Sequence, residues 1–212
     1  MGFGIAIFGY ACLLLQEFGG AAIGALLLAY GFYLASRVNV KFMYAAVTAL
    51  FLFPRGIFLL LDTVRVINLD KLTEINTALF ILNTLALITM SVFWMSAVAD
   101  IAKENGSEKL RRRAERQRVI TVLFFAAAAV LQFVLPGEGD VASRIIGARY
   151  VLQYAVLLYN IAFLHTCFVL ITTEKNHRAE MQELAKERAE KMREQYEDSK
   201  EGSGNGKKRR GR

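Results

Sequence analysis

Apolar residues gather in long runs over residues 1–173, and short polar segments separate the runs. A helix needs roughly 17–25 residues to cross a hydrocarbon layer of about 30 Å. The runs predict membrane spans over residues 3–18, 21–36, 42–61, 77–101, 119–135 and 145–173. We therefore expect an all-α, polytopic transmembrane helix bundle of about six spans in residues 1–173.

The first two runs meet at Gly19 and Gly20, which leaves two interpretations open. One continuous helix over 3–36 would be about 50 Å long and would hold Glu17 within the membrane. A hairpin places Glu17 at the water interface instead, so we expect a hairpin. Five spans are the alternative, and they would move the N-terminus to the opposite side.

Lys and Arg concentrate between the fourth and fifth predicted spans. The cations of this short segment are Lys103, Lys109, Arg111, Arg112, Arg113, Arg116 and Arg118. Short loops rich in Lys and Arg stay in the cytoplasm. We therefore expect the loop 102–118 and the C-terminus to be cytoplasmic, and residues 62–76 and 136–144 to face the outside or a lumen.

Charged residues replace the apolar runs after Thr173. Residues 174–200 are rich in good helix formers, and Glu187 and Lys191 have the favourable i,i+4 spacing, so we expect a charged cytoplasmic helix. Its thin apolar stripe drifts around the helix, which favours a solvated helix over a coiled coil. Residues 201–212 then form a flexible basic tail.

The net charge of +7 lies largely in the segment 102–118 and in residues 207–212. Cationic clusters beside a membrane attract anionic lipid headgroups by about 1 kcal/mol per residue. We therefore expect lipid contacts, and a cytoplasmic protein partner for residues 174–212, rather than nucleic-acid binding. The residues predicted to contact lipid or a partner are Arg111, Arg112, Arg113, Lys207, Lys208, Arg209 and Arg210.

Arg55 is a charged residue inside a predicted span. Such an arginine usually faces a bundle interior and has a partner there, and otherwise its charged end reaches the interface. Three other charged residues are expected at a similar depth, near the outer ends of their spans: Glu17, Asp62 and Arg149. We hypothesise a polar cluster in which Glu17 or Asp62 neutralises Arg55.

Small and polar residues within the spans predict contacts between helices. Gly20 and Gly24 form a GxxxG pattern, which favours packing within the bundle and, as the alternative, a homodimer. Asn160 and His165 in the last span predict hydrogen bonds between helices, with a proton or substrate pathway as the alternative. Trp94 is expected near an interface.

Gly137-Glu138-Gly139-Asp140 matches the GxGD pattern of intramembrane aspartyl proteases. That chemistry needs two carboxylates that share one site, and no second aspartate stands within a span to face Asp140. The sequence also lacks HExxH, GxSxG, the P-loop pattern and a Cys/His cluster with metal spacing. We therefore expect no enzymatic activity, no catalytic residue, no cofactor and no metal site.

Residues 42–135 resemble a known family of membrane proteins. The stretches that carry the resemblance are Pro54-Arg55-Gly56-Ile57-Phe58, Thr84-Leu85, Val92-Phe93-Trp94 and Glu108-Lys109-Leu110-Arg111. They are similar to the plant tobamovirus-multiplication family and its orphan-receptor-like animal relatives. The resemblance implies a seven-span, receptor-shaped protein without enzymatic activity, linked to small-GTPase-dependent traffic at vacuolar or lysosomal membranes. This chain departs from the family after Thr173, where a charged helix replaces further spans.

A second resemblance comes from Arg55-x-x-Phe58 followed by Asp62, which is similar to the fungal lipid-translocating-exporter family.

Two functional hypotheses follow from the sequence. The first is a non-enzymatic, receptor-like or organising membrane protein whose basic loop and tail contact lipid or protein partners. The alternative is a small transporter or channel that uses the polar cluster around Arg55.

Overall fold

The computed structural model describes residues 2–16, 19–134, 145 and 147–170, and every regular element in these residues is a helix. Three helical segments are long and apolar enough to cross a membrane: Lys41–Thr63, Thr73–Glu104 and Gly147–Leu170. The all-helical class is thus confirmed, and three helices have the length and apolar composition that a membrane span requires. The number of spans stays a prediction, and Glu17, the segment 136–144, the charged helix 174–200 and the tail 201–212 lie outside the described residues.

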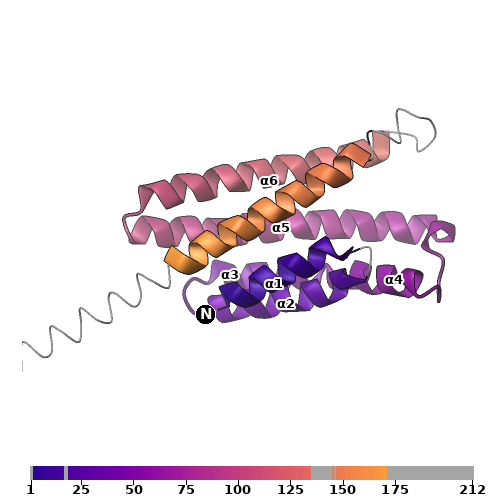
Figure 1. Cartoon of the computed structure of the whole chain (residues 1–212), viewed down its shortest axis with the longest axis horizontal. Helices are drawn as coiled ribbons and strands as arrows, with labels where there is room; N and C mark the ends of the chain where they lie inside the picture. The colour runs from indigo at the N-terminus through magenta and orange to yellow at the C-terminus, as the bar shows by residue number, and fades with distance from the viewer. Residues whose placement is uncertain (1, 17–18, 135–144, 146, 171–212) are drawn as a thin grey trace, which may run out of the picture. The chain divides into compact units, whose positions relative to one another are not determined.

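The helices follow the predicted apolar runs, with shifted ends (Figure 1). Their bounds are α1 Phe3–Leu14, α2 Gly20–Ala35, α3 Lys41–Leu50, α4 Phe53–Thr63, the 3-10 helix η2 Leu69–Lys71, α5 Thr73–Glu104 and α6 Glu108–Val134. We call Gly147–Leu170, the last helix of the described residues, the final helix. The chain divides into two compact units, Met1–Phe168 and Val169–Arg212, and the contacts described below lie within the first.

The structure confirms the hairpin between the first two helices. Gly19 turns the chain with a φ of 78°, a left-handed conformation that glycine adopts without strain. A Cβ atom on Gly24 would lie 2.8 Å from the Gly9 carbonyl oxygen, so α1 and α2 pack backbone to backbone. At 12 and 16 residues the two helices are about 18 and 24 Å long, short of a hydrocarbon layer of about 30 Å.

The two glycines of the GxxxG pattern, Gly20 and Gly24, lie in the contact between α1 and α2. A Cβ on Gly20 would lie 2.6 Å from the Cys12 carbonyl oxygen, and Gly24 faces α1 in the same way. Small side chains therefore allow close helix contact within one chain, in keeping with the favoured interpretation. The homodimer through Gly20 and Gly24 stays a prediction, and these contacts already cover both glycines with α1.

The third apolar run is a broken helix. Pro54 has no N–H to donate to Leu50, and the chain tightens into i→i−3 bonds, from Phe51 N to Thr48 O and from Leu52 N to Ala49 O, each 3.1 Å. α4 starts after this break, and Gly56 is the residue of α4 that the structure buries. The absence of a side chain at Gly56 lets α4 approach the backbone of α2 at Ala21 and Ala22.

An aromatic cluster holds the helices together around Trp94 of α5. The Trp94 ring lies 6.2 Å from Phe32 of α2 and 5.6 Å from Phe163 of the final helix, measured between ring centroids. Its indole N–H donates a buried hydrogen bond of 3.0 Å to the Tyr10 hydroxyl of α1. Trp94 is fully buried, so its side chain faces the core of the bundle, and the expectation that it lies near a membrane interface stays a prediction.

A buried polar contact joins α6 to the final helix. Gln117 Nε2 donates to Asn160 Oδ1 at 2.6 Å, and Thr121 Oγ1 donates to the same oxygen at 3.2 Å. All three side chains are buried. Asn160 therefore makes the hydrogen bonds between helices that its position predicts, whereas His165 is exposed.

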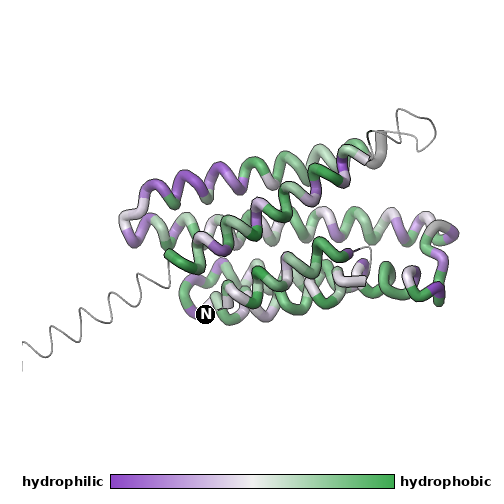
Figure 2. Tube along the Cα trace, viewed as in Figure 1, coloured by the Kyte–Doolittle hydropathy of each residue, from purple (hydrophilic) through white to green (hydrophobic). Residues whose placement is uncertain are grey.

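The predicted loop 102–118 is largely helical, which corrects the expectation. α5 continues to Glu104 and α6 begins at Glu108, so the turn between them is short and contains Gly106 with a φ of 70°. Arg, Lys, Glu and Gln are good helix formers, and Glu108 pairs with Arg112 at i,i+4. The basic residues therefore extend α6 beyond its apolar part, as the hydrophilic first half of α6 shows (Figure 2).

Candidate functional site

Arg55 and Arg149 meet on one phenylalanine of α5. The Arg55 guanidinium carbon lies 5.2 Å from the centre of the Phe80 ring, and that of Arg149 lies 5.9 Å from the same ring. Arg149 also lies 4.9 Å from the ring centre of Tyr150. Contacts at these distances are cation–π interactions. The structure thus brings together two of the four charged residues predicted to form the polar cluster.

Asp62 has a different role. Its Oδ1 accepts a hydrogen bond of 3.0 Å from the backbone N–H of Leu69, which fixes the turn between α4 and η2. Leu69 is itself buried. The fourth member of the predicted cluster, Glu17, lies outside the described residues.

Arg55 also lines a small polar pocket within the bundle. The polar residues around it are Gln16, which follows α1, Arg55 of α4, Asn83 of α5 and Gln153 of the final helix. The pocket volume is about 10 Å³, which is room for about one water molecule. The chemistry that this space allows is hydrogen bonding among side chains and a single water.

A larger groove lies between the first half of α6 and the final helix. Its volume is about 530 Å³, within the range of about 300–1,000 Å³ typical of ligand sites. The residues that line it are Glu108, Lys109, Arg112, Arg113, Arg116 and Tyr159. Lys109, Arg112 or Arg113, and Arg116 follow the i, i+3 or i+4, i+7 spacing of one helix face. We call these residues the basic groove.

Two contacts hold arginines of the basic groove in place. The Arg113 guanidinium carbon lies 5.7 Å from the centre of the buried Phe163 ring. Arg112 Nε lies 3.1 Å from Glu108 Oε1, although the Arg112 side chain is 73% exposed. Hydrogen bonds from Arg112, and then from Arg111, lower the pKa of the Glu108 carboxyl below its ordinary value, because they stabilise its charged form.

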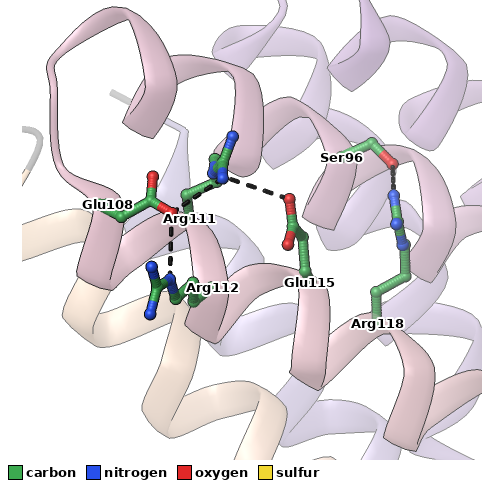
Figure 3. Close-up of polar contacts among 6 residues, drawn as sticks. All are labelled: Ser96, Glu108, Arg111, Arg112, Glu115 and Arg118. Atoms are coloured by element: carbon green, nitrogen blue, oxygen red, sulfur yellow. Dashed lines mark hydrogen bonds and ion pairs between the residues drawn. The ribbon is translucent and has the colours of Figure 1, made fainter.

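The arginines of this basic segment have different partners (Figure 3). Arg111 Nη2 contacts Glu108 Oε1 at 2.8 Å, and its Nε faces Glu115 Oε1 at 3.9 Å, outside the basic groove. Arg118 donates to the Ser96 hydroxyl of α5 at 2.9 Å. Of the three predicted lipid contacts in this segment, Arg112 and Arg113 thus line the groove and Arg111 does not. The tail residues Lys207, Lys208, Arg209 and Arg210 lie outside the described residues.

Sequence analysis did not assign Lys109, Arg116 or Tyr159 to a site. The spacing of Lys109 and Arg116 places them on one face of a helix, but it indicates a shared site only if the segment is a helix and not a loop. Tyr159 comes from a helix far away in the chain, and it lies next to Asn160, which accepts a hydrogen bond from Gln117 of α6.

Other charged groups lie at the same end of the bundle as this groove. Lys41 Nζ at the start of α3 lies 2.6 Å from Asp100 Oδ2 near the end of α5. Within the described residues, no group of three or more His, Cys, Asp or Glu side chains could hold a metal ion.

Comparisons with protein-family models, curated proteins and solved structures found no match.

Proposed function

We propose that this chain is a multi-pass integral membrane protein, receptor-like or organising and without enzymatic activity, that binds anionic groups at the cytoplasmic membrane surface. The observation that carries the proposal is the basic groove, where four cations and one carboxylate share a space of about 530 Å³. A formal excess of positive charge in such a space attracts anions.

The membrane setting supports this proposal. The three long apolar helices suit an integral membrane protein, and the Lys- and Arg-rich end of α6 belongs in the cytoplasm by the charge rule. The resemblance of residues 42–135 to the orphan-receptor-like family favours the same class of protein. The basic tail, with Lys207 to Arg210, adds a second cationic segment on the predicted cytoplasmic side.

Native mass spectrometry of the detergent-purified full chain tests the proposal. Phosphatidylserine is expected to bind more tightly than phosphatidylcholine, and this preference should weaken as salt screens the charges. A variant with Lys109, Arg112, Arg113 and Arg116 all changed to Gln should lose most of the preference. Equal binding of both lipids to the unaltered protein would contradict the proposal.

The proposed orientation has a separate test. Asn105-Gly106-Ser107 is a glycosylation sequon between α5 and α6. In a eukaryotic membrane it should carry no glycan, whereas a sequon inserted with a long linker into residues 136–144 should be modified. A glycan on Asn105 would reverse the orientation and place the basic groove outside the cytoplasm.

The second candidate function is a small transporter or channel, which rests on the polar pocket at Arg55. Four helical regions contribute polar side chains to it, yet the pocket holds about one water. Replacing Arg55 by Leu and measuring ion leak in proteoliposomes tests this candidate. Unchanged leak with a folded variant supports a structural role for Arg55, and abolished leak would favour transport.

A further inference from the structure

We infer that the basic groove is a site for one anionic phospholipid, with the headgroup phosphate on Arg112 and Arg116 and an acyl chain along the apolar surface that continues from the groove. This inference rests on the proposed function and deepens it. It replaces a diffuse attraction between charges by a defined site that holds a single lipid.

One end of this surface is cationic and the other is apolar, which matches the anionic headgroup and the apolar acyl chains of a phospholipid. From Arg116, the same face of α6 continues as exposed apolar residues, Ile120, Leu123 and Val130, of which Leu123 is 63% exposed. On the final helix, exposed Leu152 and Ala155 precede Tyr159 on one face, at spacings of three and four residues. The basic groove thus opens onto two exposed apolar stripes.

The apolar stripe is long enough for one leaflet. From Arg116 to Val130, α6 rises about 21 Å at 1.5 Å per residue. One leaflet of a hydrocarbon layer of about 30 Å is about 15 Å deep. An acyl chain that starts at the groove therefore stays in contact with α6 through its own leaflet.

The polar part of the groove fits a phosphate. Arginine presents a planar fork of N–H donors that pairs with two phosphate oxygens at once. Lys109 adds a third cation, and the Tyr159 hydroxyl, on a side chain that is 39% exposed, can donate from the opposite wall. Contacts with Phe163 and Glu108 already position Arg113 and Arg112, which lowers the entropic cost of binding.

Anionic phospholipid is a better fit than an acidic peptide because the apolar stripes need a hydrocarbon partner. Glu108 is the carboxylate in the groove, and it opposes any anion. The remaining balance is four cations against one carboxylate, a formal excess of three positive charges. That excess suits a headgroup of one to three negative charges.

The test compares two variants of the full chain that lose the same charge. Arg112→Gln/Arg116→Gln removes two cations from the groove, and Lys103→Gln/Arg118→Gln removes two from outside it. Binding of dioleoyl phosphatidylserine is measured by native mass spectrometry. We expect the groove variant to bind about thirtyfold more weakly and the control variant less than about threefold more weakly.

A second pair of variants tests the acyl-chain surface. Leu123→Gln changes the exposed stripe beside the groove, where Leu123 is 63% exposed, and Phe8→Gln changes an apolar residue of α1 that is 70% exposed. Only Leu123→Gln should weaken phosphatidylserine binding. Emission of Trp94 at an unchanged wavelength shows that each variant is folded.

The outcomes separate the inference from the proposed function. If both charge variants lose affinity equally while phosphatidylserine is still preferred over phosphatidylcholine, the single site is overturned and the charge-driven proposal stands. If phosphatidylserine is not preferred at all, both fall. If glycerophosphoserine, which lacks acyl chains, or a hexaglutamate peptide displaces the lipid at equal concentration, the phospholipid site is overturned in favour of a soluble anion or an acidic peptide.

Discussion

The change of Gly56 to Ala gives the sharpest test of how α4 packs. Gly56 is the buried residue of α4, and it faces the backbone of α2 rather than flexible side chains. A Cβ added there would lie 2.6 Å from the Ala22 Cα and 2.8 Å from the Ala21 carbonyl carbon. Backbone atoms inside a helix cannot move aside, so the two helices must separate.

The size of the effect follows from these distances. Ordinary van der Waals contacts of a Cβ begin at about 3.4 Å, and the Ala22 nitrogen lies even nearer than the Ala22 Cα, so α4 must move by about 1 Å. A gap of about 0.5–1 Å forfeits a quarter to a half of the dispersion energy of the contacts that it opens. Overpacking of this kind lowers the free energy of unfolding by about 1–3 kcal/mol. Alanine stabilises a helix by about 0.5–1 kcal/mol relative to glycine, which offsets part of this loss. We expect a net loss of about 0.5–2 kcal/mol.

Gly4→Ala is the matched control, because a Cβ on Gly4 of α1 meets no atom within 4 Å. Reversible unfolding of the purified protein in mixed micelles, followed by the emission of Trp94, measures both variants. Gly56→Ala should lower the free energy of unfolding, and Gly4→Ala should leave it unchanged or raise it. Equal stability of the two variants would refute the close contact between α4 and α2.

Three further predictions concern other parts of the molecule. Trp94 is the single tryptophan and is fully buried, so acrylamide should quench its emission weakly, whereas a tryptophan placed at Phe8 in a Trp94→Phe background should be quenched strongly by brominated lipid. Asn160→Leu removes the acceptor shared by Gln117 and Thr121 and should cost about 1–2 kcal/mol in the same unfolding assay, with part regained in Asn160→Leu/Gln117→Leu; no loss would contradict the buried contact. Because hydrogen bonds lower the Glu108 pKa, its ion pairs should persist at neutral pH and be lost only as the pH falls below the ordinary glutamate range; a carboxyl titration by NMR at or above that range would contradict them.

The positions of the helices could be predicted from the sequence, because apolar runs mark buried or lipid-facing helices directly. The hairpin at Gly19 also followed from the sequence, since one long helix would have held Glu17 within the membrane. The start of α6 could not be predicted in this way. The residues before Val119 are polar, so hydropathy placed them in a loop, although their helix propensity and the Glu108–Arg112 spacing favour helix.

The candidate sites were predictable only in part. The presence of Arg55 in a span indicated a contact inside the bundle, but the sequence could not name Phe80, because a cation–π contact depends on how helices pack sideways. Asp62 satisfies a local backbone N–H that no hydropathy pattern reveals. Tyr159 lines the basic groove from another helix, and its neighbour Asn160 contacts Gln117, which is 43 residues away in the chain.

The helices of this bundle differ widely in length, and the surrounding lipid must adapt to them. α5, with 32 residues, is about 48 Å long, whereas α1, with 12 residues, is about 18 Å long and exposes Phe8. A bilayer avoids leaving apolar surface in water, and one beside short apolar helices becomes thinner at a cost of a fraction of a kcal/mol per Å. We expect the lipid beside the α1–α2 hairpin to be thinner than the lipid beside α5. Around one bundle the lipid thus meets a short and a long hydrophobic length, and α5 fits the same bilayer by tilting or by extending beyond it.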